Sequence, residues 1–163
     1  MRRDERAARA LVLVVLFSGI GVGVASAGDS LYGKVTEVRS ADVVVLDYGS
    51  GQYVVRLVGI QADTSGLAAG GAKEMVRKLV LGKNVRIRFG GRNANDEMVS
   101  QLLTDDPVDG IKDVGLELLR AGLVHRMQGE DHEFGYKYNE LSLAESEART
   151  AKRGLWAPAP PPR

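Results

Sequence analysis

The sequence has no cysteine, few aromatic residues and almost no excess of either charge. Without cysteine, the chain can form neither a disulfide scaffold nor a cysteine-ligated zinc ribbon. A formal net charge of +1 removes the simplest electrostatic case for nucleic-acid binding, although a local basic patch stays compatible with it. With 44% hydrophobic and 26% charged residues, the 163-residue chain has the composition of one folded domain.

Residues 1–27 have the pattern of a targeting segment. Four arginines precede the apolar run at residues 11–17, and the segment ends on the small residues Ala25, Ser26 and Ala27. This order is typical of a secretory signal peptide, so we predict cleavage after Ala27 and a secreted or periplasmic protein with no remaining membrane span. The alternative is an uncleaved membrane anchor, because residues 10–27 approach the length that spans a bilayer.

The first half of the remaining chain predicts a β-sheet with one helix inserted into it. Five segments with β-branched or alternating apolar residues predict strands, at residues 31–38, 42–47, 52–60, 85–89 and 98–103. Turn residues 48–51 join the second and third strands as a hairpin. Apolar residues at helical spacing predict a helix over residues 72–80, which Gly82 ends.

The second half predicts two helices and a proline-rich tail. Asp109 or Asp113 can cap a helix that contains Val114 and Leu118 and ends at Gly122. A last helix is predicted over residues 136–153, with an apolar stripe along one side. Residues 158–163 are mostly proline and predict a polyproline-like extension.

Charge is segregated along the chain although it nearly cancels overall. Between residues 73 and 92 there are seven basic residues and a single acidic one, Glu74. One interpretation is a phosphate-binding surface that includes Arg86, Arg88 and Arg92. The other is an ordinary solvated face.

The order of these elements resembles the staphylococcal nuclease-like (thermonuclease) family. Five sequence blocks carry the resemblance, at residues 54–60, 82–83, 121–124, 144–149 and 154–156. Together they cover residues 30–157. The resemblance implies an α+β fold in which a five-stranded OB-fold β-barrel has an inserted helix after strand three and two C-terminal helices. It makes residues 28–157 the domain and residues 158–163 its tail.

The family's reaction is calcium-assisted hydrolysis of phosphodiester bonds in DNA or RNA. Such chemistry needs carboxylates to hold the cation, a glutamate to activate water and two arginines to clamp the phosphate. The resemblance makes Arg56 the first arginine, retained as a catalytic position, and Asp42 a retained but weak metal ligand. Gln61, Thr64 and Ser100 replace the second metal-binding aspartate, the catalytic glutamate and the second arginine.

These replacements predict that efficient hydrolysis is lost and that the protein acts as a binding module. Its expected partner is single-stranded nucleic acid or another anionic polymer, and no cofactor is expected unless a calcium site is partly retained. The alternative is an active, calcium-dependent secreted nuclease with a rearranged site, in which Asp63 substitutes as a metal ligand and Arg92 as a clamp. A third interpretation is an envelope protein whose basic face contacts anionic polymers or lipids.

Several residues have a structural interpretation beside a functional one. Arg56 can pair with Asp42 within the barrel without any role in chemistry. His125 and His132 are the only histidines, show no paired ligand spacing and are predicted at the surface. Tyr136, Tyr138 and Trp156 are predicted to pack in the core.

Overall fold

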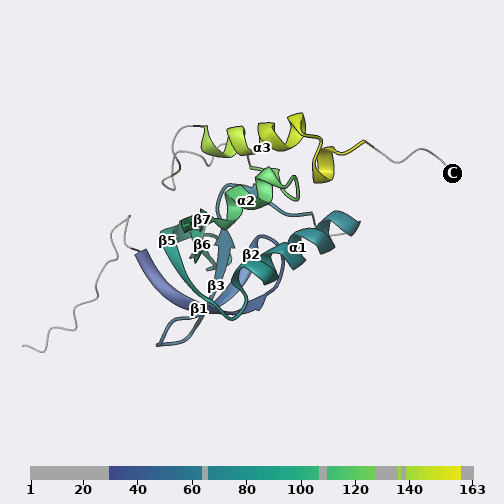
Figure 1. Ribbon diagram of the computed structural model, residues 1–163. Helices are drawn as coiled ribbons and strands as arrows, with labels where there is room; N and C mark the ends of the chain where they lie inside the picture. The colour runs from purple at the N-terminus through teal and green to yellow at the C-terminus, as the bar shows by residue number, and fades with distance from the viewer. Residues whose placement is uncertain (1–29, 64–65, 107–109, 128–135, 137–138, 159–163) are drawn as a thin grey trace, which may run out of the picture.

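The computed structural model describes residues 30–63, 66–106, 110–127, 136 and 139–158 (Figure 1). The predicted signal peptide therefore lies outside the described residues, as do Thr64, Asp109, His132, Tyr138 and residues 159–163 of the predicted tail. None of the helices in the described ranges has the length and apolar character needed to cross a membrane.

Five strands close into a barrel. They are β1 (Ser30–Val38), β2 (Val43–Asp47), β3 (Gln52–Leu57), β5 (Asn84–Arg92) and β6 (Met98–Asp106). Their order is β3-β2-β1-β5-β6 with antiparallel neighbours, and a parallel pairing of β3 with β6 closes the ring. This arrangement confirms the predicted OB-fold barrel with its inserted helix.

Three short strands extend this barrel. β7 (Gly110–Asp113) pairs with the outer edge of β6. β4 (Ile60–Gln61) and β8 (His125–Arg126) form a separate two-stranded ribbon. The predicted third strand, residues 52–60, is thus two strands, because the chain turns at Gly59 with a φ of 74°. A side chain there would also collide with Leu141 of the last helix.

Alternation along the strands fills the barrel with aliphatic side chains. Every second residue points inward, and these residues are fully or almost fully buried: Val35, Val44, Leu46, Val55, Leu57, Val85, Ile87 and Leu102. The residues between them point outward. The outer face of the barrel therefore carries the charged side chains from which a functional site can be built.

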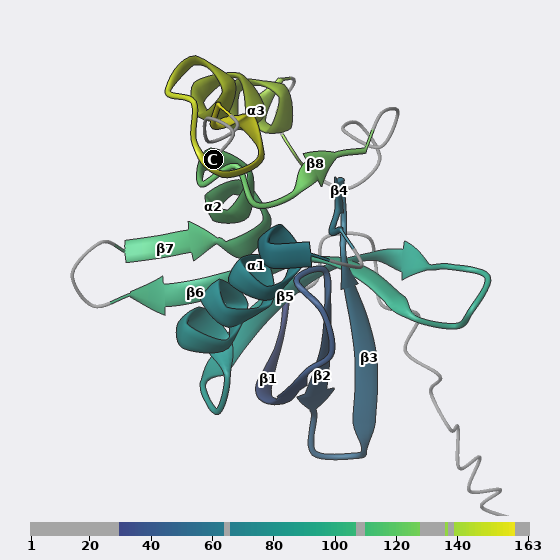
Figure 2. The same ribbon diagram turned by 90° about the vertical axis from the view of Figure 1, so that its right-hand side faces the viewer.

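The helices cover one end and one side of the barrel (Figures 1 and 2). α1 (Gly66–Val80) buries Ala72, Val76 and Val80, and it begins six residues before the predicted start because its glycine-rich first turns are also helical. α2 (Val114–Arg120) is capped by Asp113, whose Oδ1 accepts a hydrogen bond from the Leu116 N–H at 3.1 Å.

The last helix packs mainly on α2, and its Leu141 also reaches the end of the barrel at Gly59. α3 (Glu140–Thr150) buries Leu141, Ala144 and Ala148. It is shorter than predicted at both ends, and Asn139 ahead of it has a left-handed φ of 73°. The 3₁₀ turn η1 (Gly154–Trp156) then ties the segment after α3 to the turn after α2, since the Leu155 N–H donates to the Gly122 carbonyl at 2.8 Å.

Candidate functional site

Arg56 of β3 lies between two carboxylates. Its Nη1 donates to Asp42 Oδ2 at 2.8 Å, and its Nε donates to Glu97 Oε2 at 2.8 Å. The barrel brings the three residues together: Val43, next to Asp42, pairs with Arg56 across β2 and β3, and the β3–β6 pairing sets Arg56 beside Val99. The guanidinium therefore holds two ion pairs from two different neighbouring strands.

Both carboxylates are themselves fixed by polar neighbours. Asp42 Oδ1 accepts a hydrogen bond from the Ser40 hydroxyl at 2.6 Å, and Asp42 is only 8% exposed. Glu97 Oε2 also accepts from Asn93 Nδ2 at 2.7 Å, while Asn93 Oδ1 accepts from the Glu97 N–H. This cluster, Ser40, Asp42, Arg56, Asn93 and Glu97, is named the Arg56 cluster below.

Contacts within the cluster favour the charged forms of Arg56 and Glu97. The hydrogen bond to Glu97 raises the pKa of Arg56, with the charges of Asp42 and Glu97 adding to it against the opposing effect of burial. The hydrogen bonds from Arg56 and Asn93 lower the pKa of Glu97. Two carboxylates and one guanidinium leave a net charge of −1, which disfavours a phosphate at this position.

Three members of the Arg56 cluster, Ser40, Asp42 and Arg56, line one wall of a cleft of about 450 Å³. α1 supplies the opposite lining with Gly70 and Lys73, and Asp63 follows from the segment after β4. Arg39 also lines the cleft but pairs with Glu37 at 3.4 Å. Among the described residues, Lys73 is the cation of this lining without a carboxylate partner.

Asp42 and Asp63 share the cleft but do not form a calcium site. Both oxygens of Asp42 already accept hydrogen bonds, and Asp63 Oδ1 lies 3.7 Å from His125 Nε2. Gln61, which replaces a metal-binding aspartate, is exposed on β4. Within the described ranges, no three histidine or acidic side chains gather closely enough to hold a metal ion. The residues present therefore do not fit a calcium ion, which needs six to eight oxygen ligands.

The other predicted site residues lie apart from the cleft. Ser100 is fully buried inside the barrel on the same side of β6 as Met98 and Leu102, so it contributes nothing to the outer face. Arg92 is held in the β5–β6 turn, with Nη1 3.0 Å from Asp96 Oδ1. Arg86 and Arg88 lie on the outward side of β5, separated from Arg56 by β6.

Glu97 is the site residue that the sequence analysis missed. It lies 41 positions from Arg56, and only closure of the barrel makes the two neighbours. The available pointer was an acidic residue directly before the predicted strand at residues 98–103. Such a residue lies at a strand end, where side chains of adjacent strands meet.

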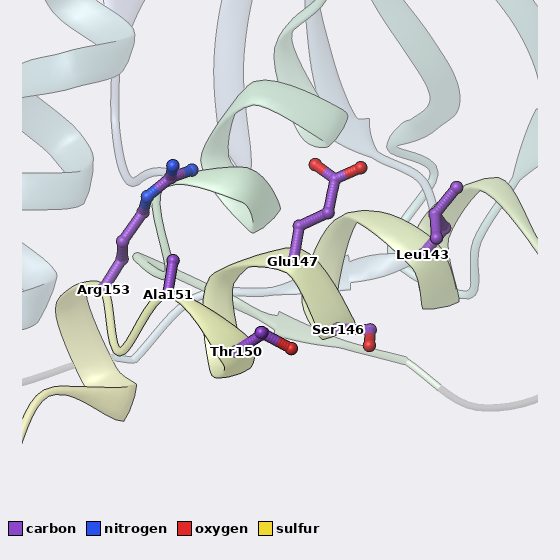
Figure 3. A pocket seen from close by; sticks show the side chains of 6 residues that line it. All are labelled: Leu143, Ser146, Glu147, Thr150, Ala151 and Arg153. Carbon is purple, nitrogen blue, oxygen red and sulfur yellow. The ribbon is translucent and has the colours of Figure 1, made fainter.

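His125 and Trp156 belong to a second group on the α3 side. His125 contacts Trp156 edge to face at 5.6 Å between ring centroids, and the Arg149 guanidinium lies 4.0 Å from the centre of the Trp156 ring. Trp156 is only partly buried, whereas Tyr136 is 7% exposed and packs in the core as predicted. Figure 3 shows a hollow beside α3. Glu147, which lines this hollow, pairs with Arg120 of α2 at 3.4 Å, so we assign the hollow to the packing of α3 on α2.

Comparison with known families decides what this barrel is. Residues 54–158 match the family described as staphylococcal nuclease homologue. The chain belongs to this family. As a staphylococcal nuclease homologue, it is similar to an "Uncharacterized endonuclease" of Escherichia coli O157:H7, with 27% identity over 135 residues and 80% of each chain covered. A protein of the same description from Escherichia coli matches with the same identity and coverage.

Proposed function

We propose that this staphylococcal nuclease homologue binds single-stranded nucleic acid or a similar anionic polymer and has lost efficient phosphodiester hydrolysis. The observation that carries the proposal is the neutralisation of Arg56, whose guanidinium is paired with Asp42 and Glu97. A phosphate clamp must offer free N–H groups and positive charge to its substrate. Two of the five N–H donors of Arg56 are engaged, and its positive charge is outweighed by two carboxylates, so Arg56 is a weak phosphate clamp unless an ion pair breaks.

The side chains that this sequence lacks at the family's catalytic positions each make a large contribution to the reaction rate. Gln61 and Thr64 cannot act as the metal-binding carboxylate and the general base, and Ser100 is a buried hydroxyl where the family has an arginine. Removal of a general base or a transition-state donor each costs about 10²-fold to 10⁴-fold in rate, although such terms do not add simply. We therefore expect turnover close to background.

Export is part of the same proposal and depends on residues 1–27. The basic segment, apolar run and small-residue end predict cleavage after Ala27 and a secreted or periplasmic location. Amino-terminal sequencing of the protein recovered outside the cytoplasm tests this. A mature chain that begins at Gly28 agrees with it, and an intact amino terminus in the membrane fraction indicates an anchor instead.

A nuclease assay tests the loss of hydrolysis. Purified protein is incubated with single-stranded DNA and RNA, in calcium and in EDTA, beside an Arg56→Ala variant. We expect no cleavage above the variant. Calcium-dependent cleavage that Arg56→Ala abolishes would reject the proposal.

The second candidate function is an active nuclease with a rearranged site. It is favoured by the position of Asp63 in the same cleft as Asp42, and by the word "endonuclease" in the description of both Escherichia coli relatives. This candidate requires a retained calcium site. It predicts cleavage that disappears in EDTA and in an Asp63→Asn variant.

A further inference from the structure

Most arginines in the described part of the chain are neutralised by a neighbouring carboxylate. Arg39, Arg56, Arg77, Arg92, Arg120 and Arg149 each have an acidic partner within 4.0 Å. Arg86 and Arg88 on β5 are exceptions among the described residues. The Arg88 Nη1 donates to Gln101 Oε1 at 3.1 Å, a neutral acceptor that orients the guanidinium without cancelling its charge.

The register of β1 and β5 places an exposed aromatic ring beside these two cations. Tyr32 lies directly opposite Arg86, so both side chains leave the same outer face of the barrel. Arg88 is the diagonal neighbour, at about 7–8 Å for such a pair. Tyr32 is 58% exposed, whereas the large aromatic ring of a tyrosine is usually at least partly buried.

Carboxylates border this surface but do not cover it. Lys34, two residues beyond Tyr32, lies opposite Asp47 in the β1–β2 register. On the other side, Arg86 pairs with Leu103, and Asp113 beyond it accepts bonds from α2 and Tyr136. In the described chain, Arg86 and Arg88 beside Tyr32 thus have no acidic partner within ion-pair distance.

We infer that Tyr32, Arg86 and Arg88 form a docking surface for single-stranded nucleic acid, on which a base stacks against Tyr32 while the arginines bind the flanking phosphates. An exposed ring beside two cations suits an unpaired strand, because every base has a face that can stack and each nucleotide carries a phosphate. A duplex keeps its bases inside the helix and offers no such face. This inference rests on the proposed function and assigns its ligand to β1 and β5, away from the Arg56 cleft.

Binding of a fluorescent oligothymidylate to the purified protein, followed by anisotropy, tests the docking surface. We expect Tyr32→Ala to weaken binding about tenfold, and Tyr32→Phe to bind like the parent, because the ring alone supplies stacking. The matched control is Tyr48→Ala, which removes another exposed tyrosine, 42% exposed, from the β2–β3 turn. Arg88→Gln should make the slope of log affinity against log salt concentration shallower by about 0.7, the value for one lost phosphate contact. Arg77→Gln, which makes the same change in net charge, is the control for this variant.

Dextran sulfate, a polyanion without bases, separates stacking from simple charge attraction. We expect it to bind Tyr32→Ala and the parent equally well. Equal weakening of oligonucleotide binding by Arg88→Gln and Arg77→Gln would overturn the inference in favour of diffuse attraction. Weakening by Lys73→Gln with none by Tyr32→Ala would place the ligand in the Arg56 cleft, which overturns this inference and leaves the proposed function standing. Failure of the parent to bind any oligonucleotide would overturn this inference, and failure to bind dextran sulfate as well would reject the proposed function.

Discussion

The Arg56 cleft and the outer face of β1 and β5 both present arginine, but in opposite electrostatic conditions. In the cleft, Arg56 occupies a position matched to the family's chemistry and is bonded to two carboxylates. On β5, Arg86 and Arg88 match no catalytic position and have no acidic partner in the described chain. Retention of a residue type at a family position is therefore a poor guide to function unless its charge is also available.

The largest expected effect is on stability, and it separates the two regions. Arg56→Met should lower the free energy of unfolding by about 2 kcal/mol, because it leaves Asp42 and Glu97 partly buried without their counter-charge; the value is reduced from that of a fully buried pair since Arg56 is 35% exposed. Arg86→Met should change it by less than about 0.5 kcal/mol. Urea unfolding of both variants measures the difference. Equal losses would mean that Arg86 is as structural as Arg56.

Asp113 gives the next largest effect and concerns the border of the β1–β5 surface. Burial raises its pKa to about 6, against the hydrogen bonds from Leu116 and Tyr136 that lower it. The folded state therefore binds the proton more tightly than the unfolded chain, in which the pKa of Asp113 is near 3.8. This contribution to stability is complete below about pH 4 and is lost as the pH rises through 6.

An Asp113→Asn variant tests that dependence, because asparagine keeps a capping oxygen but does not ionise. Relative to the parent, the variant should gain roughly 1 to 2 kcal/mol of unfolding free energy between pH 4 and pH 7. Urea unfolding at the two pH values measures the gain. The same difference between parent and variant at both pH values would show that Asp113 is not the titrating group.

A smaller effect should appear when the cleft is made to resemble the outer face. Glu97→Gln removes one of the two negative charges on Arg56 while keeping a hydrogen-bond acceptor. We expect oligonucleotide affinity at low salt to rise about threefold. The slope of log affinity against log salt concentration should become steeper by about 0.7. Glu147→Gln on α3, which makes the same change in net charge, serves as the control. A rise of the same size in both variants would assign the gain to overall charge.

The smallest expected effect is that of calcium. Asp42 and Asp63 do not form a calcium site, so millimolar calcium should move the melting temperature by less than about 1 °C. Differential scanning fluorimetry in calcium and in EDTA measures the shift. A shift of several degrees that Asp63→Asn removes would support the rearranged nuclease and would remove the contrast between the two regions.

Much of the fold could be predicted from periodicity. The five barrel strands follow from alternation of buried and exposed residues, and α1 from apolar residues at helical spacing. The start of α1 could not be predicted, because its glycine-rich first turns have low helix propensity and the context of the fold overrides it. The short strands β4 and β8 were missed for a similar reason, since two-residue strands carry no period of their own.

Of the site, the sequence allowed us to predict some of the residues that belong to it but not how they are bonded to one another. Asp42 and Arg56 were identified by matching residues along the chain, and both line the cleft. Their bonding state could not be predicted, because Glu97 reaches Arg56 through the β3–β6 pairing of two distant segments. The three arginines of β5 likewise have similar sequence surroundings, yet only Arg92 has an aspartate placed to bind it by the hairpin turn.

The parallel pairing of β3 with β6 also has a consequence for the order of folding. It joins residues 55–57 to residues 98–100, so, like the β1–β5 and β4–β8 pairings, it brings together distant segments of the chain, and such contacts form more slowly than local ones. The bond from Arg56 to Glu97 cannot exist until that step is complete. The bond from Arg56 to Asp42 needs only the local β2–β3 hairpin, so a chain with that hairpin formed and the barrel still open pairs Asp42 and leaves Glu97 unpaired.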